Sequence, residues 1–314
     1  MKLGFYNDGT NDWILGVVKN DTHIVDVSEA LEGVHAHGAQ ELITLIIANF
    51  DKVKDTFQKL VDVSDGIPLE QVKIRPPLPR PDQIFCMAVN YLEFGQRPMP
   101  QIDAFQKSSD CVIGDGDTVR LDPNCEATIF HHEAELAVVI GSDAKNVSQA
   151  DAMDKVFGYT GFIDVSARGF EPGGRTSFFQ VKSWPTFGPM GPFIITKDEI
   201  EDPHAISLHI TNNGEERQAF STDDMAHKIP ECIEFITRIA HLGPGDVIST
   251  GTNHQGLGAL QHGDQIQFTV EKIGTLSVNV DDPARREWRR GVDEEMAARM
   301  RTSDGTSMGM GDRK

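Results

Sequence analysis

One stretch indicates both the fold and the chemistry of this chain: His131-His132-Glu133-Ala134-Glu135-Leu136-Ala137-Val138-Val139-Ile140-Gly141. Two carboxylates stand two residues apart at the head of an otherwise apolar run. On a strand, side chains alternate between the two faces, so Glu133 and Glu135 should point the same way. Unpaired buried anions are costly, and a hard divalent cation with oxygen ligands would compensate them. A strand that begins at the surface with two solvated glutamates is the alternative, and the pair by itself favours that alternative.

A second β-prone run contains one further acid. It reads Gly158-Tyr159-Thr160-Gly161-Phe162-Ile163-Asp164-Val165-Ser166-Ala167-Arg168, and it is followed by Lys182-Ser183-Trp184, by Phe187–Pro192 and by Gly245–Thr252. In this order and spacing, the segments resemble the catalytic domain of the fumarylacetoacetate hydrolase family. The resemblance extends from about residue 81 to about residue 282, roughly two thirds of the chain.

The resemblance implies a metal site and a fold. The family binds Mg²⁺, or in some members Mn²⁺ or Ca²⁺, and the matching ligands here are Glu133, Glu135 and Asp164. It also implies a mixed β-sandwich roll, and a homodimer, since family members commonly assemble through the β-rich domain. Three carboxylates exceed the charge of a dication, so a nearby lysine makes electrostatic sense. Lys182, which the family motif supplies to the site, is expected to stabilise developing negative charge, although in isolation it would read as a surface lysine.

Further site residues follow from the resemblance. Thr252 matches the residue that hydrogen-bonds the substrate carboxylate, and Lys107 matches a segment with a weaker claim to the same role. Tyr91 lies in the segment that leads into the active-site lid. Arg168 is expected to position the Asp164 carboxylate or its loop, and a surface ion pair is its alternative.

The lid sequence departs from the family pattern. A histidine followed three residues later by a glutamate normally activates the hydrolytic water, but this chain has Phe94 and Arg97 at those positions. Two residues could replace the missing base. His254 lies beside Thr252, and a histidine titrates near neutral pH; a structural loop histidine is the alternative. Glu93 is the second candidate.

Two histidines precede the carboxylate pair. Adjacent residues on a strand face opposite ways, so at most one of His131 and His132 can share the face of the glutamates, and by parity it is His131. We expect both histidines to support the site or the structure rather than bind the metal.

These residues predict a divalent-metal-dependent hydrolase that cleaves a C–C bond in a 2,4-dioxo acid, an acylpyruvate or fumarylpyruvate-like compound, through a metal-stabilised enolate. Phe94 motivates an alternative within the family, a lyase or isomerase that needs no activated water: a 2-keto-3-deoxy sugar-acid dehydratase, an oxaloacetate decarboxylase or a 2-hydroxymuconate-type isomerase. A protein that binds an oxo acid without turnover is the second alternative.

The composition of the chain argues against nucleic acids and membranes as binding partners. With a net charge of −19 over 314 residues, the chain lacks the basic surface that nucleic acids and anionic membranes require. The four scattered cysteines form no zinc motif and suggest a reducing compartment. The N-terminus has no apolar signal-peptide region, and no apolar run approaches the ~20 residues of a membrane span. We therefore expect a cytoplasmic enzyme that acts on a small molecule.

The pattern along the chain predicts an α+β, β-rich fold. Residues 1–75 read as a small N-terminal α/β domain, residues 76–284 as the catalytic domain, and residues 285–314 as a charged, partly disordered tail with a helix over 292–300. Many short strands with few helices favour a sandwich or roll over a doubly wound sheet. The expected strands are 13–18, 23–27, 83–89, 130–140, 158–165, 192–195, 206–211, 246–249, 265–270 and 274–280, and the other expected helices are 40–60 and 224–241.

Overall fold

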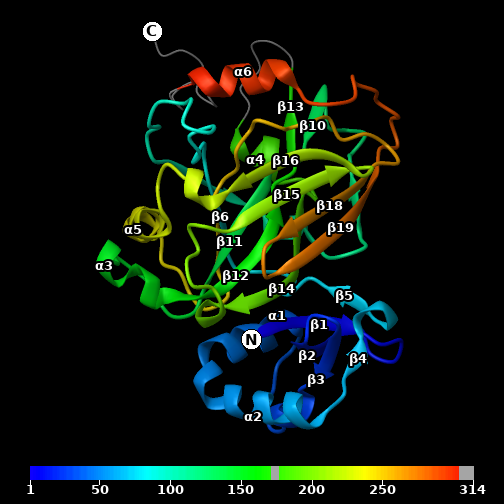
Figure 1. The fold of residues 1–314 in the computed structure, drawn as a ribbon, viewed down its shortest axis with the longest axis vertical. Helices are drawn as coiled ribbons and strands as arrows, with labels where there is room; N and C mark the ends of the chain where they lie inside the picture. The colour runs from blue at the N-terminus through cyan, green and yellow to red at the C-terminus, as the bar shows by residue number, and fades with distance from the viewer. Residues whose placement is uncertain (171–176, 304–314) are drawn as a thin grey trace.

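The computed structural model describes residues 1–170 and 177–303 (Figure 1). It confirms the β-rich, mixed α+β fold. The largest sheet has twelve strands, ten of them in one path and two, β5 (Lys73–Arg75) and β8 (Val112–Ile113), paired beside it. The path runs β4 (Ile67–Pro68), β3 (His23–Asp26), β2 (Ile14–Lys19), β1 (Lys2–Asn7), β14 (Gly188–Thr196), β12 (Val156–Ile163), β11 (Ala134–Ile140), β17 (Val247–Ser249), β6 (Ile84–Met87), β7 (Ala104–Lys107).

A second, five-stranded sheet packs on the first. Its order is β16 (Glu215–Ser221), β15 (Ser207–Asn212), β18 (Gln265–Val270), β19 (Gly274–Asp281), β9 (Thr118–Arg120). In β18 the residues alternate between exposed and buried, as expected of a strand with one face on the core. By contrast, every residue of β11, β12 and β14 is buried, because these strands are covered on both faces. The result is a two-layer sandwich.

The first 75 residues extend the large sheet. Strand β1 pairs with β2 on one side and with β14 on the other, where Leu3 lies opposite Ile194. Figure 1 shows this blue region below the main body, with the helices α1 (Ala39–Ala48) and α2 (Phe50–Val63). The prediction of a single helix over 40–60 is wrong, because this region forms two helices separated at Asn49. Asn49 leaves the helical conformation, and its side chain donates to the Leu45 carbonyl oxygen at 3.0 Å, which competes with helix continuation.

The predicted strand 130–140 is two strands. Strand β10 (Ile129–His131) pairs with β13 (Ser166–Arg168) in a separate two-stranded sheet, whereas β11 begins at Ala134. The partner strand breaks at the same level, since β12 ends at Ile163. Glu133 and Asp164 occupy the two breaks, and the Asp164 amide donates to the Glu133 carbonyl oxygen at 2.9 Å. Both acids thus lie where a paired set of strands passes from one sheet into another.

Helices cover the edges of the sandwich. They are α3 (Gln149–Ala152), α4 (Phe178–Lys182), α5 (Ile229–Ile239) and α6 (Glu294–Thr302). Helix α5 is shorter than predicted, because it begins after a capping box in which the Glu231 carboxylate accepts from the Lys228 amide at 2.9 Å. Helix α6 begins two residues later than predicted, and the disorder expected at the end of the chain, residues 304–314, lies outside the described residues. No helix in the described ranges has the length and apolar character required to cross a membrane.

Candidate active site

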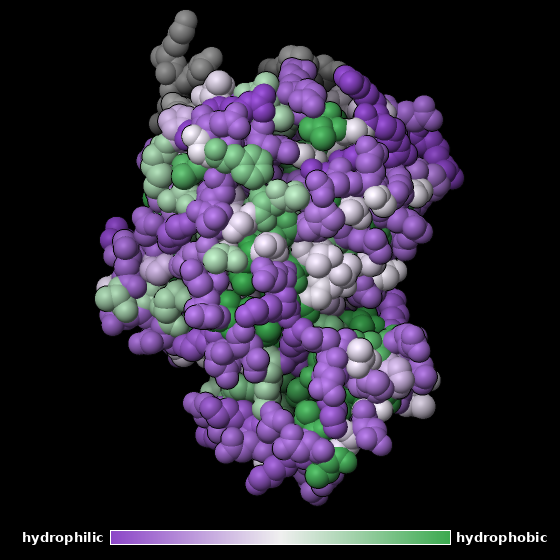
Figure 2. Space-filling view, in the orientation of Figure 1, coloured by the Kyte–Doolittle hydropathy of each residue, from purple (hydrophilic) through white to green (hydrophobic). Residues whose placement is uncertain are grey.

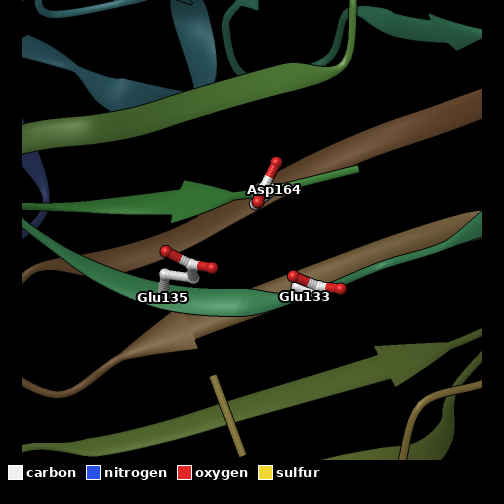
Figure 3. A group of neighbouring side chains, drawn as sticks. All are labelled: Glu133, Glu135 and Asp164. Atoms are coloured by element: carbon white, nitrogen blue, oxygen red, sulfur yellow. The ribbon is translucent and has the colours of Figure 1, made fainter. Parts of the chain in front are cut away.

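Three carboxylates meet at the break between the sheets. Glu133, Glu135 and Asp164 are 4%, 1% and 1% exposed, and their nearest oxygens all lie within 4.8 Å of one another. Figure 3 shows Glu133 and Glu135 on one ribbon and Asp164 at the end of the neighbouring strand, with the three carboxylates turned toward a common space. The predicted ligand set therefore comes together, although the strand alternation used to predict it is interrupted at Glu133.

Three cations accompany the three carboxylates. Lys182 donates to Glu133 Oε2 at 2.7 Å and to Asp164 Oδ2 at 2.6 Å. Arg168 pairs with Glu133 Oε1. Lys107 was predicted to contact substrate, but its Nζ atom donates to Asp164 Oδ1 at 2.5 Å. These ion pairs engage Glu133 and Asp164 and leave Glu135 without a cationic partner among the described residues.

Glu135 consequently ionises less readily than Glu133. Burial raises its pKa to about 8, and the negative charges of Asp164 and Glu133 contribute. Burial also acts to raise the pKa of Glu133, but the charges of Lys182 and Arg168 outweigh it and lower that pKa below its usual range. Among the described residues, the Glu135 carboxylate accepts hydrogen bonds from Ser249 Oγ and from the Gly251 amide, the latter at 3.0 Å. A buried carboxylate without a cation, among three converging oxygen donors, fits a hard divalent metal ion.

The two candidate bases form one unit. His254 Nδ1 lies 2.7 Å from Glu93 Oε1, and the His254 amide donates to Glu93 Oε2 at 2.9 Å. Glu93 and Phe94 both have positive φ angles, 54° and 59°, in the lid segment. This backbone places Glu93 fully inside the protein and leaves Phe94 53% exposed. The sequence offered Glu93 and His254 as alternatives, and the structure brings them together.

The electrostatics of the pair connect it to the carboxylates. Burial acts to raise the pKa of Glu93, but the charge of His254 and hydrogen bonds from His254 and Gln255 lower it overall. The charge of His254 also contributes to the lowered pKa of Glu133, so the imidazole lies within electrostatic reach of the acid cluster. His254 is itself 4% exposed.

Sequence analysis missed Gln218, which holds the loop beside the acids. Its side-chain amide donates to Thr252 Oγ1 at 2.9 Å and to the Asn253 carbonyl at 2.6 Å, and its oxygen accepts from the Ala134 amide at 3.2 Å. It thereby ties the start of β11 to the predicted substrate-binding threonine. A buried glutamine that makes both kinds of bond has no local sequence signal, because its partners are 34 to 86 residues away.

Tyr91 and the two histidines that precede the carboxylate pair contact other side chains of the protein. The ring of Tyr91 is fully buried and packs edge-on against Phe220, with centroids 5.1 Å apart. His131 Nε2 lies 3.0 Å from Asp293 Oδ2, and His132 Nδ1 lies 3.1 Å from Gln218 Oε1. The parity argument for His131 does not apply, because the chain changes sheets after it.

Comparisons with known proteins agree on one family. The family model for the fumarylacetoacetate (FAA) hydrolase C-terminal region matches residues 83–281. An oxaloacetate tautomerase of Bacillus subtilis is 38% identical over 227 residues, which cover 67% of this chain and 73% of that protein.

Two solved structures extend the likeness to most of the chain. A maleylpyruvate hydrolase from Sphingobium sp. SYK-6, in complex with manganese(II) and pyruvate, superposes with a TM-score of 0.78 at 31% identity over 90% of this chain and 99% of that one. A 2-hydroxyhepta-2,4-diene-1,7-dioate isomerase from Mycobacterium marinum has a TM-score of 0.69 at 28% identity, over 90% of this chain and 99% of the other. With its sandwich fold and its cluster of three buried carboxylates, this chain belongs to the fumarylacetoacetate hydrolase family.

Proposed function

We propose that this chain is a divalent-metal-dependent hydrolase that cleaves a C–C bond in a 2,4-dioxo acid. Glu133, Glu135 and Asp164 would hold the metal, and His254 with Glu93 would act as the general base. The observation that carries the proposal is the His254–Glu93 contact of 2.7 Å. It supplies a histidine–carboxylate pair in a chain whose lid has Phe94 at the position of the family histidine.

The proton position on His254 follows from its partner. An ionised carboxylate only accepts hydrogen bonds, so the neutral imidazole carries its proton on Nδ1, facing Glu93, and keeps Nε2 free to accept one. In hydrolysis, Nε2 takes a proton from water as the water oxygen adds to the C4 carbonyl carbon. The C3–C4 bond then breaks, and C3 takes up a proton, which gives a 2-oxo acid and a carboxylic acid.

The charges around the acids support an anionic substrate. A bound Mg²⁺, Mn²⁺ or Ca²⁺ would supply Lewis acidity toward the carboxylate and adjacent carbonyl oxygens of a 2-oxo acid. Lys107, Lys182 and Arg168 already balance the three carboxylates, so the two charges of a metal ion would leave the site positive. Lys182, 4% exposed, would stabilise the negative charge that develops as the bond breaks. Thr252 Oγ1, held by Gln218, would donate to the substrate carboxylate.

An oxaloacetate tautomerase is the second candidate. The observation in its favour is the 38% identity to the Bacillus subtilis protein of that description. The same base would then move a proton between carbon and oxygen of the 2-oxo acid, and no water would be consumed.

One experiment separates the two reactions. The protein is incubated with Mg²⁺ in ¹⁸O-water, with a panel of acylpyruvates in one series and with enol-oxaloacetate in the other. Hydrolysis predicts pyruvate release with ¹⁸O in the carboxyl group of the second product. Accelerated decay of enol absorbance, without cleavage of any acylpyruvate, would reject the hydrolase in favour of the tautomerase. His254→Asn should slow whichever reaction occurs.

A further inference from the structure

The chain beyond residue 281, where the family match ends, returns to the proposed base. Val292 forms a β-bridge with Gly258, and the Asp293 amide donates to the Leu257 carbonyl at 2.7 Å. In Figure 1, helix α6 (red) lies at the end of the molecule opposite the N-terminal strands. Its residues Met296 and Met300, 6% and 0% exposed, pack with Leu257 and Val89 in one apolar cluster. The C-terminal segment, residues 292–303, therefore covers the loop of residues 252–257, which carries His254 and is called the base loop below, and also Val89 at the start of the lid segment.

Gln255 connects this segment to the histidine–carboxylate pair. Its side-chain nitrogen donates to Glu93 Oε2 at 2.7 Å and to the Ala297 carbonyl on α6 at 3.1 Å. Its side-chain oxygen accepts from Arg301, one turn further along the helix. Both the nitrogen and the oxygen of the Gln255 side-chain amide thus take part in hydrogen bonds that link Glu93 to α6.

Strand β16 contacts the base loop on the side away from the C-terminal segment. An added Cβ on Gly256 would lie 2.0 Å from the Arg217 carbonyl oxygen on β16, so the loop backbone is in direct contact with that strand. The lid makes a second attachment, because Arg97 Nε donates to the Ser303 carbonyl at 2.7 Å. Gln218 and the backbone of β16 hold the loop from the sheet side, and α6 holds it from the other side through Gln255.

We propose that the C-terminal segment positions the His254–Glu93 pair, and that Gln255 is the residue through which it does so. The kinetic part of this inference rests on the proposed function, whereas the structural part does not. Removal of Gln255 would leave Glu93 Oε2 with the His254 amide alone among its described partners, and the carboxylate could rotate away from Nδ1.

Two other charged residues lie near Glu93. The negative charge of Asp224 opposes the ionisation of Glu93, and Arg301 forms its hydrogen bond with Gln255 instead. Asp224 lies on the lid side, where it accepts from the Phe94 amide at 3.1 Å and from Asn253 at 2.8 Å, and Glu93 contributes to its raised pKa. Because Gln255 helps to lower the pKa of Glu93, its removal should raise that pKa.

The first test needs no substrate. Full-length Gln255→Met, Arg301→Met and the control Gln149→Met are labelled with ¹⁵N-histidine, and the Nδ1 proton of His254 is followed by NMR. Gln149→Met removes a comparable glutamine–glutamate bond of 2.9 Å on the surface between α3 and α5. The wild type and the control should show a sharp downfield signal, and Gln255→Met should broaden or lose it. Retention of the wild-type signal in Gln255→Met would overturn the proposal.

The second test measures turnover of whichever 2-oxo acid the enzyme accepts. Loss of a hydrogen bond to a charged group predicts that kcat falls about tenfold to a hundredfold in Gln255→Met, with KM nearly unchanged. The acid limb of the pH profile should move to higher pH, because Glu93 would take up a proton more readily. A lost NMR signal with unchanged kcat would keep the positioning role and reject the pair as the base.

The helix side gives an independent variant in case Gln255→Met folds poorly. Arg301→Met leaves the Gln255–Glu93 bond in place and removes one of the two bonds from Gln255 to α6, so a weaker effect of the same direction is expected in both tests. Arg301→Lys keeps a donor and should restore the signal and the rate. Equal behaviour of Arg301→Met and the wild type in both tests would contradict a role for the Arg301 side chain of α6 in positioning the pair.

Discussion

Nζ of Lys107 lies 2.5 Å from Oδ1 of Asp164, and both side chains are at most 1% exposed. Lys182 holds the other oxygen of the same carboxylate, at 2.6 Å. Lys107 ends β7 at the edge of the large sheet, and Lys182 ends α4, so two unrelated elements orient Asp164. The orientation of one proposed metal ligand is thus determined by the packing of the whole domain.

The metal-free protein should depend strongly on Lys107. Lys107→Met would leave a buried carboxylate with one cation fewer, a change that typically costs about 3–5 kcal/mol. We expect a large drop in melting temperature without metal and a smaller drop in excess Mg²⁺. The matched control is Lys54→Met, because Lys54 pairs with Asp51 at 3.5 Å on the surface and should change little in either condition. Equal losses with and without metal would contradict the proposed site.

Metal binding should stabilise the fold. A ligand at 100 times its Kd adds about 2.7 kcal/mol to the free energy of unfolding, so Mg²⁺ or Mn²⁺ added after chelation should raise the melting temperature. Glu135→Gln replaces a charged carboxylate ligand by a neutral amide and should abolish the shift and the heat of binding in calorimetry. A full shift in Glu135→Gln would place the metal elsewhere.

His254→Ala should lower turnover about 10²- to 10⁴-fold, the usual contribution of a positioned general base. Metal affinity measured by calorimetry should remain that of the wild type, because His254 is not a proposed ligand. Glu93→Gln keeps an acceptor oxygen for Nδ1 but loses the charge, so a smaller loss is expected. Near-full activity in His254→Ala would assign the base to another group.

The attachment of the C-terminal helix should weaken in acid. The hydrogen bond from His131 lowers the pKa of Asp293 to about 2, and the Met296 amide contributes to this shift. Asp293 has an unfolded-state pKa of about 3.9. Its contribution to stability is therefore present above about pH 4 and lost as the pH falls toward 2. The melting temperatures of the wild type and Asp293→Asn should differ at pH 7 and converge in acid; a constant difference would contradict this.

The protein should be a homodimer, as expected for this family. Light scattering at micromolar concentration should give about twice the 34.6 kDa mass of one chain. Phe179, 68% exposed, and Ile239, 72% exposed, are apolar residues that an interface could cover. Figure 2 shows that apolar residues also reach the surface in patches between polar ones on the face in view. The mass of a single chain would exclude the dimer.

Local patterns were sufficient for part of this description. Strands such as β18 follow the alternation of their residues, and the acids Glu133, Glu135 and Asp164 were predicted from motif order. The roles of Lys107 and Gln255 depend on partners 57 and 162 residues away, and no periodicity encodes such contacts. Sequence reasoning likewise treated Glu93 and His254 as rivals, because only the fold of the lid makes them neighbours.

The pairing of β1 with β14 gives the N-terminal residues a protective role. The nine residues of strand β14 are all buried, and Lys2 and Leu3 of β1 pair with its residues Ile195 and Ile194. Without them, this part of the apolar strand β14 would present unpaired backbone groups, and an edge of that kind can recruit other chains into aggregates. The proline-rich connection at residues 75–81 thus joins the catalytic domain to β1, the strand that covers its edge. If the chain were cleaved there, β1 would still be paired with β14.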